Sequence, residues 1–343
     1  LHGQVARRMW NYLWPDKQVD EVPISHVTNG IHTGTWIARR MMLLYDRYLG
    51  PDWMERVDDP QVWELVQNIP DEELWGVRRH LKRKLAAHMR DRARRMWLNG
   101  DKHPVQVVAG GVLIDPYVLT IGFARRFAPY KRANLVLTDT ERLLKLINNQ
   151  EKPVQIIFAG KSHPDHEGGK MLIQEVYRAV KRSESGGRLV FLEDYDMNLA
   201  RYLIQGVDVW LNTPRRPNEA SGTSGQKAAL NGVLNFSVMD GWWREGYNGQ
   251  NGWAIGSDTD VENQDLQDEQ DAISLLDNQE NEIVPLYYQI RSSDNLPGEW
   301  INRMKESIIS LSPRFGMTRM VKEYLDDYYL PAIDRQQVKQ PGD

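Results

Sequence analysis

The stretch from Asn212 to Gly232 concentrates residue types that could hold a cofactor or a sugar. Glu219 supplies a carboxylate, and the small residues 221–225 predict a turn whose backbone amides can face a ligand. Lys227 follows this turn at the start of a helical run of apolar residues. Apolar surroundings disfavour the charged amine and lower its pKa, which suits a lysine that forms an imine. An ordinary surface lysine is an equally good interpretation at this point.

A second cluster is basic and follows an apolar run. Arg125, Arg126, Lys131 and Arg132 lie close together in the sequence, directly after a predicted strand that ends at Phe123. Arginine offers a planar fork to a phosphate, lysine offers a point charge, and a helix that begins just afterwards adds backbone N–H groups. We therefore expect an anion site here, with a surface basic cluster as the alternative.

Two other groups of polar residues have simpler explanations. Glu193, Asp194 and Asp196 could perform acid–base chemistry, but they lie where a helix begins, so we expect them to cap that helix. His163 and His166 could ligate a metal ion. Neither histidine has carboxylates around it at metal-binding spacing, so we predict no metal site.

The pattern around these clusters predicts a parallel sheet. Short β-branched runs alternate with helical ones, which is typical of βαβ units with helices on both faces of the sheet. The predicted strands are Val105–Val108, Val118–Phe123, Val154–Ala159, Leu189–Leu192, Val207–Leu211 and Leu234–Val238. The predicted helices between them are Ala133–Asn148, Gly169–Arg182, Asn198–Gln205 and Gly225–Asn231. Ligands of such sheets bind beyond the carboxyl ends of the strands, where the polar clusters begin.

Helical patterns lie on both sides of this region. A long helix is predicted from Pro70 to Leu98, and nine of its residues are Lys or Arg. We expect them to form a solvated face paired with acidic neighbours, with an anion-binding face as the alternative. Residues 258–282 hold ten acidic and no basic side chains, and they predict a solvated surface helix. An amphipathic helix is predicted at Phe315–Tyr329.

Composition excludes several classes of protein. The 343 residues, 41% hydrophobic and 26% charged, are typical of a globular chain with more than one core. No apolar run reaches the roughly 18–20 residues that cross a bilayer, so we expect no membrane partner. The net charge of −4 argues against a nucleic-acid binder. The absence of cysteine excludes disulfides, thiolate metal sites and cysteine nucleophiles.

Three motifs, in order along the chain, resemble those of one enzyme family. They are VTNGIH at 27–32, FARRFAPYKR at 123–132 and EASGTSGQK at 219–227. Together they resemble the α-glucan phosphorylases of glycogen, starch and maltodextrin, and most closely the shorter bacterial type. The resemblance covers nearly the whole chain, as far as Tyr324.

The resemblance implies a fold and a chemistry. Family members have two Rossmann-like domains that face each other across a cleft, the glycosyltransferase B architecture, so we expect an α/β fold with a doubly wound parallel sheet. They transfer the terminal α-1,4-linked glucose of a glucan to inorganic phosphate with retention, giving glucose 1-phosphate. They carry pyridoxal 5′-phosphate as an imine on a lysine, here Lys227, and use its phosphate group rather than its ring.

The resemblance also assigns residues to the two phosphates. Arg126 and Lys131 resemble the pair that binds the substrate phosphate and the cofactor phosphate. Arg125 takes the place of a lysine beside the cofactor phosphate, and Tyr195 resembles a tyrosine near the cofactor. The predicted cofactor-binding residues are Lys227, Arg125, Tyr195, Thr223, Ser224 and Gly225.

The sugar is assigned to a different set. Glu219 resembles a carboxylate that binds sugar hydroxyls, and Ser221 and Gly222 resemble backbone donors to the sugar. His32, in a predicted loop at Ile24–Trp36, resembles a histidine that contacts the glucose near its 6-hydroxyl. The predicted catalytic residues are Lys227, Arg126, Lys131 and His32.

Two residues depart from the family pattern. Gln226 stands where methionine is usual, and as a polar side chain it needs a hydrogen-bond partner. Pro129 stands where threonine or glutamate is usual, and its ring fixes one backbone angle of the phosphate loop.

The resemblance divides the chain into three parts. Residues 1–103 are expected to be the mostly helical end of an N-terminal glucan-binding domain, most of which lies outside this sequence. Residues 104–315 are expected to bind cofactor and phosphate. Residues 316–343 are expected to be a helix that crosses back to the N-terminal domain, with an exposed apolar stripe, plus a tail. Expected partners are glycogen or maltodextrin and inorganic phosphate, and the full protein is expected to be a cytoplasmic homodimer.

Two other functions stay open. A glycogen or starch synthase has the same architecture but uses a nucleotide-sugar donor and no pyridoxal. A non-catalytic module that binds glucan or anions would also explain the basic cluster. Borohydride labelling of Lys227 would distinguish the phosphorylase from the synthase, and turnover would distinguish it from the module.

Overall fold

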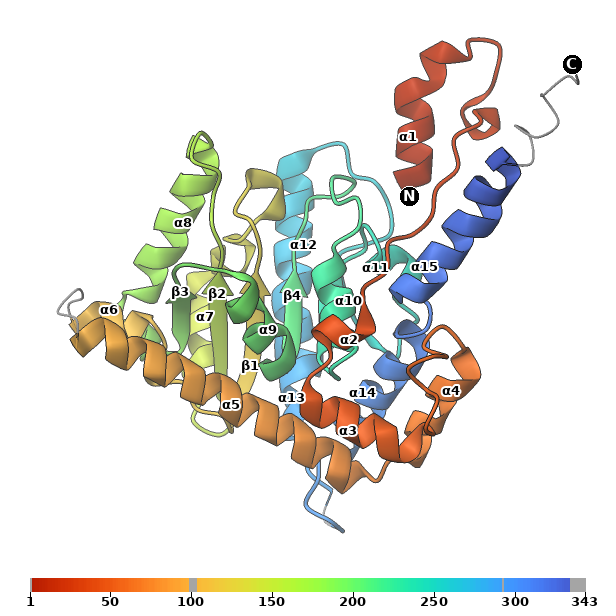
Figure 1. The fold of residues 1–343 in the computed structure, drawn as a ribbon. Coiled ribbons are helices and arrows are strands. Elements are labelled where there is room, and N and C mark those ends of the chain that lie inside the picture. Colours follow the sequence, from red (N-terminus) through yellow and green to blue (C-terminus); the bar gives the residue numbers. More distant parts are fainter. Residues whose placement is uncertain (1, 99–103, 292, 334–343) are drawn as a thin grey trace, which may run out of the picture.

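The sheet predicted from the sequence forms the centre of the molecule. The computed structural model describes residues 2–98, 104–291 and 293–333, which hold six parallel strands in the order β3-β2-β1-β4-β5-β6 (Figure 1). The strands are β1 (Leu119–Ala124), β2 (Val154–Ala159), β3 (Leu189–Leu192), β4 (Val209–Asn212), β5 (Leu234–Val238) and β6 (Gly252–Ile255). This order reverses direction between β1 and β4, as in doubly wound Rossmann-like sheets, so the predicted fold class is confirmed.

Helices surround the sheet within the described residues. Before it come α1 (His2–Trp10), α2 (Thr33–Trp36), α3 (Arg39–Tyr48), α4 (Pro60–Glu64), α5 (Asp71–Leu98) and α6 (Pro104–Ala109). Between the strands lie α7 (Thr140–Ile147), α8 (Glu167–Val180), α9 (Met197–Gly206), α10 (Thr223–Ala229) and α11 (Trp243–Gly246). After it come α12 (Gln264–Asn278), α13 (Val284–Tyr288), α14 (Gly298–Leu311) and α15 (Met317–Tyr324).

Both faces of the sheet are buried under helices. Successive side chains along a strand point to opposite sides, so each strand contributes to a core on either face. In β1, Ile121 and Phe123 enter the apolar core that α7, α8 and α12 complete. Ala124, together with Ile157 of β2, enters the core on the other side, which α5, α9 and α10 complete. Strands that are buried on both faces are apolar along most of their length, which is why they could be located in the sequence.

One strand prediction was wrong, and one strand was missed. The predicted strand Val105–Val108 is part of the helix α6, which packs against α5 and β3. A short run that contains three valines fits a strand or a helix, and Pro104 favours a helix start. The sequence pattern also missed β6, a four-residue edge strand that begins at Gly252 and contains only one β-branched residue, Ile255.

The basic face predicted on α5 is partly buried. Lys82 donates to Asp208 Oδ2 at 2.5 Å and to the Tyr287 hydroxyl at 2.7 Å. The Arg78 guanidinium donates to the backbone carbonyl of Asn231 at 2.9 Å, and to the carbonyls of Gln205 and Val207 at the C-terminal end of α9. The prediction of a wholly solvated face was therefore wrong for these two cations, which fix α5 to the sheet.

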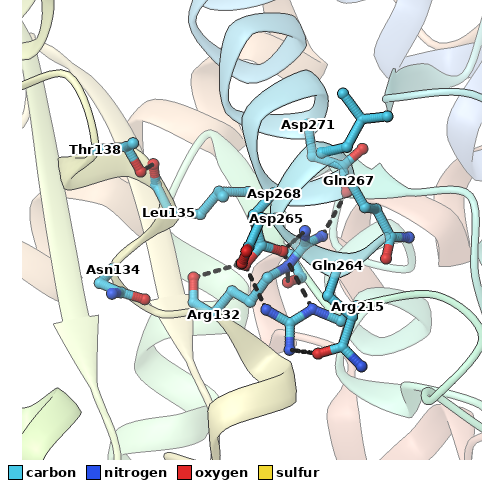
Figure 2. Close-up of polar contacts among 12 residues, drawn as sticks. Arg132, Asn134, Leu135, Thr138, Arg215, Gln264, Asp265, Gln267, Asp268 and Asp271 are labelled. Carbon is cyan, nitrogen blue, oxygen red and sulfur yellow. Dashed lines mark hydrogen bonds and ion pairs between the residues drawn. The ribbon is translucent and has the colours of Figure 1, made fainter. Parts of the chain in front are cut away.

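The acidic segment 258–282 was also only partly solvated. It forms α12 as predicted, but Asp268 and Asp271 turn inward towards arginines (Figure 2). Asp268 pairs with Arg132 and with Arg215, whose charges balance the acidic helix. The sequence could not predict this pairing, because the partners are far apart in the chain.

The first and last helices project beyond the sheet (Figure 1). The loop before α2 pairs with the start of α15, since Ile31 N–H donates to the Phe315 carbonyl and Met317 N–H to the Ile31 carbonyl. Beyond that bridge, Val321, Leu325 and Tyr329 expose 44–61% of their surface. This is the apolar stripe expected on the C-terminal helix. The predicted tail, the last dozen residues, lies almost wholly outside the described residues, which end at 333.

Among the residues that the structure describes, no helix combines the length and the apolar character that crossing a bilayer requires.

Candidate functional site

The candidate site lies where the strand order reverses. β1 and β4 are neighbours there, and their carboxyl ends bring Arg125 and Asn212 together. The Arg125 guanidinium donates a short hydrogen bond to Asn212 Oδ1. Open α/β sheets bind their ligands at such a reversal, so the basic cluster after β1 and the polar stretch after β4 meet at the expected place.

Glu219 links these two clusters. Its Oε2 accepts from Arg125 Nη2 at 2.5 Å and from Lys131 Nζ at 3.0 Å, and only about a tenth of each side chain is exposed. Burial alone would raise the pKa of Glu219, but Arg125 and Lys131 outweigh it and hold the pKa below its usual value. Glu219 is thus ionised at neutral pH, and the three groups together stay cationic.

Arg126 lies at the exposed edge of this cluster. Among the described residues it forms no ion pair, in contrast to Arg125 beside it. Lys131 closes a short 3-10 turn, Pro129–Lys131, in which the proline occupies the first position. The fixed backbone angle of Pro129 suits that position, so this departure from the family pattern fits the local structure.

Arg132, the fourth cation of the predicted anion site, points elsewhere (Figure 2). It is 3% exposed, donates to the carbonyl oxygens of Thr213 and Pro214, and pairs with Asp268 and Asp271. Its backbone is left-handed, with φ of 45°, which turns the side chain away from its neighbours. Including Arg132 in the anion site was therefore wrong, because its charge is neutralised inside the protein.

Lys227 lies on α10, with its side chain partly buried. Its Nζ is 4.0 Å from the centroid of the Trp36 indole ring, and among the described residues no carboxylate pairs with it. Burial lowers the pKa of Lys227 below its ordinary value. A lysine with a depressed pKa and no counterion has the properties of a reactive amine and not of an ordinary surface lysine.

The turn before Lys227 depends on glycine. Gly222 has φ of +87°, in the left-handed region that glycine adopts without strain. A Cβ on Gly225 would lie 2.4 Å from Asn235 Oδ1, so only glycine fits there. Ser224 Oγ accepts from the Trp210 indole, and Ser221 Oγ is buried without a hydrogen-bond partner. Thr223, next to Gly222, is half-buried.

Tyr195 and Asp196 follow β3. Burial raises the pKa of Tyr195 to about 12, while the nearby charge of Arg125 opposes the rise. Asp196 accepts from the Leu199 N–H at 2.7 Å and caps α9, as the sequence predicted for this acidic group. Tyr195 is therefore a protonated hydroxyl close to the basic cluster, and Asp196 is structural.

His32 lies apart from the groups described so far. Its Nδ1 is 2.8 Å from Thr35 Oγ1 and accepts from the Thr35 N–H, so the ring caps α2, which occupies the end of the predicted loop. Its side chain is exposed. Within the described residues, no polar contact joins it to Glu219 or Ser221, so its predicted role stays a prediction.

His2 lines a cavity of about 140 Å³ together with His26, Ser221, Trp242 and Glu245. Its Nε2 is buried without a hydrogen-bond partner and lies 3.9 Å from Asp240 Oδ1. Sequence reasoning missed His2, because it is far from Ser221 in the sequence and only the tertiary fold brings the two together.

Gln226 connects two of the sequence motifs. Its amide nitrogen donates to the carbonyl of Asn29 at 3.1 Å, so the nitrogen of the side-chain amide has the hydrogen-bond partner that the sequence predicted it would need. Its Oε1 is buried and has no partner. The bond joins the motif at 27–32 to the motif that carries Lys227.

The histidines considered as metal ligands have local roles. His166 Nδ1 accepts from the Gly169 N–H and caps α8, and His163 Nδ1 accepts from the Asp165 N–H. In the part of the chain that the structure describes, no group of three His, Asp or Glu residues is arranged to hold a metal ion.

Comparison with known proteins agrees with this geometry. The family model for carbohydrate phosphorylase matches residues 7–292. A glycogen phosphorylase of Aquifex aeolicus is 48% identical over 328 residues, which is 96% of this chain. A maltodextrin phosphorylase of Thermococcus litoralis is 47% identical over 342 residues, and a glycogen phosphorylase of Mycobacterium tuberculosis is 42% identical over 332 residues, each covering 97% of this chain.

These relatives are longer than this chain. The matched region is 46% of the Aquifex protein, 39% of the Thermococcus protein and 38% of the Mycobacterium protein. The chain therefore spans less than half the length of the relatives that it matches.

Proposed function

The chain belongs to the carbohydrate phosphorylase family, and from this premise we propose that it forms the phosphate- and cofactor-binding part of an α-glucan phosphorylase. The proposed reaction transfers the terminal α-1,4-linked glucose of glycogen or maltodextrin to inorganic phosphate, with retention, and gives glucose 1-phosphate. The matched relatives are glycogen and maltodextrin phosphorylases, which supports this substrate class.

One observation carries the proposal. Arg125 and Lys131 converge on Glu219 at the reversal of strand order, and Arg126 lies exposed beside them. Two phosphates close together repel each other strongly, so a site that holds both needs several cations. A cationic cluster at the ligand-binding edge of the sheet meets this requirement.

The residues present fit pyridoxal 5′-phosphate. Lys227 has a pKa lowered by burial, and its Nζ lies against the indole of Trp36. Arg125 Nε is buried without a protein partner and is a donor suited to a phosphate oxygen. Gly222 and Gly225 keep the preceding turn free of side chains. We propose that Lys227 holds the cofactor and that Arg125, Tyr195, Thr223, Ser224 and Gly225 surround it.

The cofactor, when bound, supplies a phosphate group that meets the substrate phosphate. The protein's own part in the chemistry is to bind and neutralise: Arg126 and Lys131 hold the substrate phosphate close to the sugar. A phosphate so placed stabilises the positive charge that develops at the anomeric carbon. Glycosidases use a pair of carboxylates for this task, whereas Glu219 is tied to two cations and serves to bind hydroxyls.

We assign the sugar to Glu219, Ser221 and Gly222, with His32 retained from the sequence as a further candidate. His2 is added to this group, because it lines the same cavity as Ser221 and its Nε2 has no protein partner. An unpartnered buried nitrogen beside a small polar cavity is suited to a sugar hydroxyl.

The wider organisation rests on the family relationship. We propose that residues 1–103 end an N-terminal glucan-binding domain, that 104–315 form the catalytic domain and that the helix within 316–343 returns to the first domain. We further propose that the full protein is a cytoplasmic homodimer.

Turnover tests the proposal. The complete polypeptide containing this chain, supplied with pyridoxal 5′-phosphate, maltodextrin and inorganic phosphate, should release glucose 1-phosphate with the α configuration. Omitting inorganic phosphate is the control and should stop the release. Elongation of maltodextrin from a nucleotide sugar, without release of glucose 1-phosphate, would instead identify a synthase and refute the proposal.

A further inference from the structure

A second basic cavity lies outside the site described above. Its volume is about 500 Å³, within the range of small-molecule sites, and it lies between the α2–α3 connection, α5 and α9. The side chains that line it include three cations, two amides and a tyrosine hydroxyl. These residues are Arg39, Lys84, Arg201, Asn198, Gln205 and Tyr202. No Asp or Glu lines it, and neither Lys227 nor Arg125 does.

The three cations are unneutralised. Arg39, Lys84 and Arg201 form no ion pair with any residue that the structure describes, and α3 has no acidic residue in its first turn. Some other arginines of this chain do have carboxylate partners: Arg132 and Arg142 each meet two carboxylates. Gathering like charges without counterions is unfavourable, so this cavity is a candidate for an anionic ligand.

Two of the three exposed cations lie over aromatic rings. Lys84 Nζ lies 5.3 Å from the centroid of the Tyr202 ring, which stacks on His88 with a centroid separation of 3.9 Å. Arg201 lies 5.9 Å from the centroid of Trp36. Gln205 donates to the Trp36 carbonyl. Cations that are ordered before the ligand arrives lose less entropy on binding it.

The surrounding charge has the same sign. Burial, and then the positive charges of Arg40, Arg83 and Lys84, lower the pKa of His80 on α5. Of the basic residues predicted on this helix, Lys82 and Arg78 are buried in the core, whereas Lys84 lines this cavity.

We propose that this cavity binds a diphosphate group, either as free pyrophosphate or as the diphosphate of a nucleotide. Two phosphoryl groups carry about three to four negative charges near neutral pH, which matches the three cations. The amides of Asn198 and Gln205 and the Tyr202 hydroxyl supply neutral hydrogen bonds to the remaining oxygens. A neutral glucan would leave the cations without a counter-charge.

A cation of this cavity and the proposed cofactor lysine contact the same aromatic ring. Arg201 and Lys227 both lie over the Trp36 indole, at 5.9 and 4.0 Å from its centroid. A diphosphate that draws Arg201 away would change the electrostatic surroundings of Trp36. The inference does not rest on the proposed function, because none of the cavity's cations belongs to the catalytic cluster.

Calorimetric titration of this chain with pyrophosphate, at low ionic strength, tests the proposal. We expect saturable binding, and about tenfold weaker binding for each of Arg201→Gln and Lys84→Gln, as one charge-assisted contact is lost. The matched control is Lys152→Gln, an exposed lysine in the loop before β2, which should bind like the unchanged chain. Inorganic phosphate should bind at least about tenfold more weakly than pyrophosphate, because it meets fewer of the cations.

The catalytic cluster is the competing location for the probe, so Arg126→Gln is titrated in parallel. Loss of pyrophosphate binding in Arg126→Gln but not in Arg201→Gln would place the probe at the catalytic cluster and overturn the proposal. Equal weakening by Lys152→Gln would also overturn it, since binding would then be non-specific. A nucleoside diphosphate that binds more tightly than pyrophosphate, with the same loss in Arg201→Gln, would identify the nucleotide as the source.

Discussion

The Nζ of Lys227 lies 4.0 Å from the centroid of the Trp36 indole, and this contact joins two segments that are far apart in the sequence. Trp36 ends α2, just after the motif at 27–32, while Lys227 lies on α10 after the glycine turn. The contact explains how an amine near the sheet stays partly buried without a carboxylate partner. The predictions below test the groups that surround it.

The glycine turn gives the first prediction. Gly222→Ala should lower the free energy of unfolding by about 1–2 kcal/mol, because left-handed backbone costs an L-residue that much. Gly249→Ala is the matched control: its φ is +88°, and an added Cβ would have no atom within 4 Å. Urea unfolding should show similar losses in both variants. Only Gly222→Ala, beside Glu219, should slow phosphorolysis, and equal turnover in the two variants would contradict its role.

Glu219 gives a prediction about stability and pH. Glu219→Gln should lower the free energy of unfolding by about 3 kcal/mol at pH 7, because two buried cations lose their counter-charge. The pKa of Glu219 is lowered in the folded state, so its contribution is complete above the unfolded pKa and is lost as the pH falls through the folded pKa. The gap between Glu219→Gln and the unchanged chain should therefore close in acid.

The control for that measurement is Glu269→Gln, which removes an exposed carboxylate of α12. It should change the free energy of unfolding by less than about 0.5 kcal/mol. A gap between Glu219→Gln and the unchanged chain that does not narrow at all as the pH is lowered, down to the most acidic pH at which both stay folded, would show that the ionised carboxylate is not the stabilising species.

Arg126 should matter for phosphate more than for glucan. In the complete polypeptide, Arg126→Ala should raise the KM for phosphate by about tenfold or more and change glucan affinity little, because a guanidinium on the phosphate meets only the anion. Arg178→Ala, an exposed arginine on α8, is the control and should leave both parameters unchanged. Equal losses for phosphate and glucan would count against the assignment.

The buried pair of α5 gives a prediction about the fold. Lys82→Met should lower the free energy of unfolding by about 3–5 kcal/mol, because it leaves Asp208 charged and unpaired in the core. Arg83→Met, one residue along and exposed, should have an effect of about 0.5 kcal/mol or less. Similar stability of the two variants in chemical denaturation would show that the pair does not hold α5 to the sheet.

The fold was largely predictable from local sequence. β2, β3 and β5 have the predicted bounds, because strands buried on both faces form short apolar runs bounded by polar residues. β6 was missed, since a short edge strand opened by glycine has little such signal. The helix α6 was taken for a strand, because periodicity cannot separate the two in so short a run.

The site was predictable only where its residues are close in the sequence. Arg125, Arg126 and Lys131 follow one strand, and the fold rule for parallel sheets correctly placed them at the ligand-binding edge. The direction of the Arg132 side chain depends on the left-handed backbone of Arg132 itself and on its ion pairs with carboxylates of α12. No local sequence pattern reveals either feature. His2 reaches Ser221 only through the tertiary fold.

The central claim is that Lys227 is the amine that carries pyridoxal 5′-phosphate. The most direct measurement is to saturate the protein with the cofactor, reduce it with borohydride, digest it and locate the added pyridoxyl mass. We expect one label per chain, on the peptide that contains Lys227, and none on this peptide in Lys227→Ala. A label spread over exposed lysines such as Lys152, or no label at saturating cofactor, would contradict it.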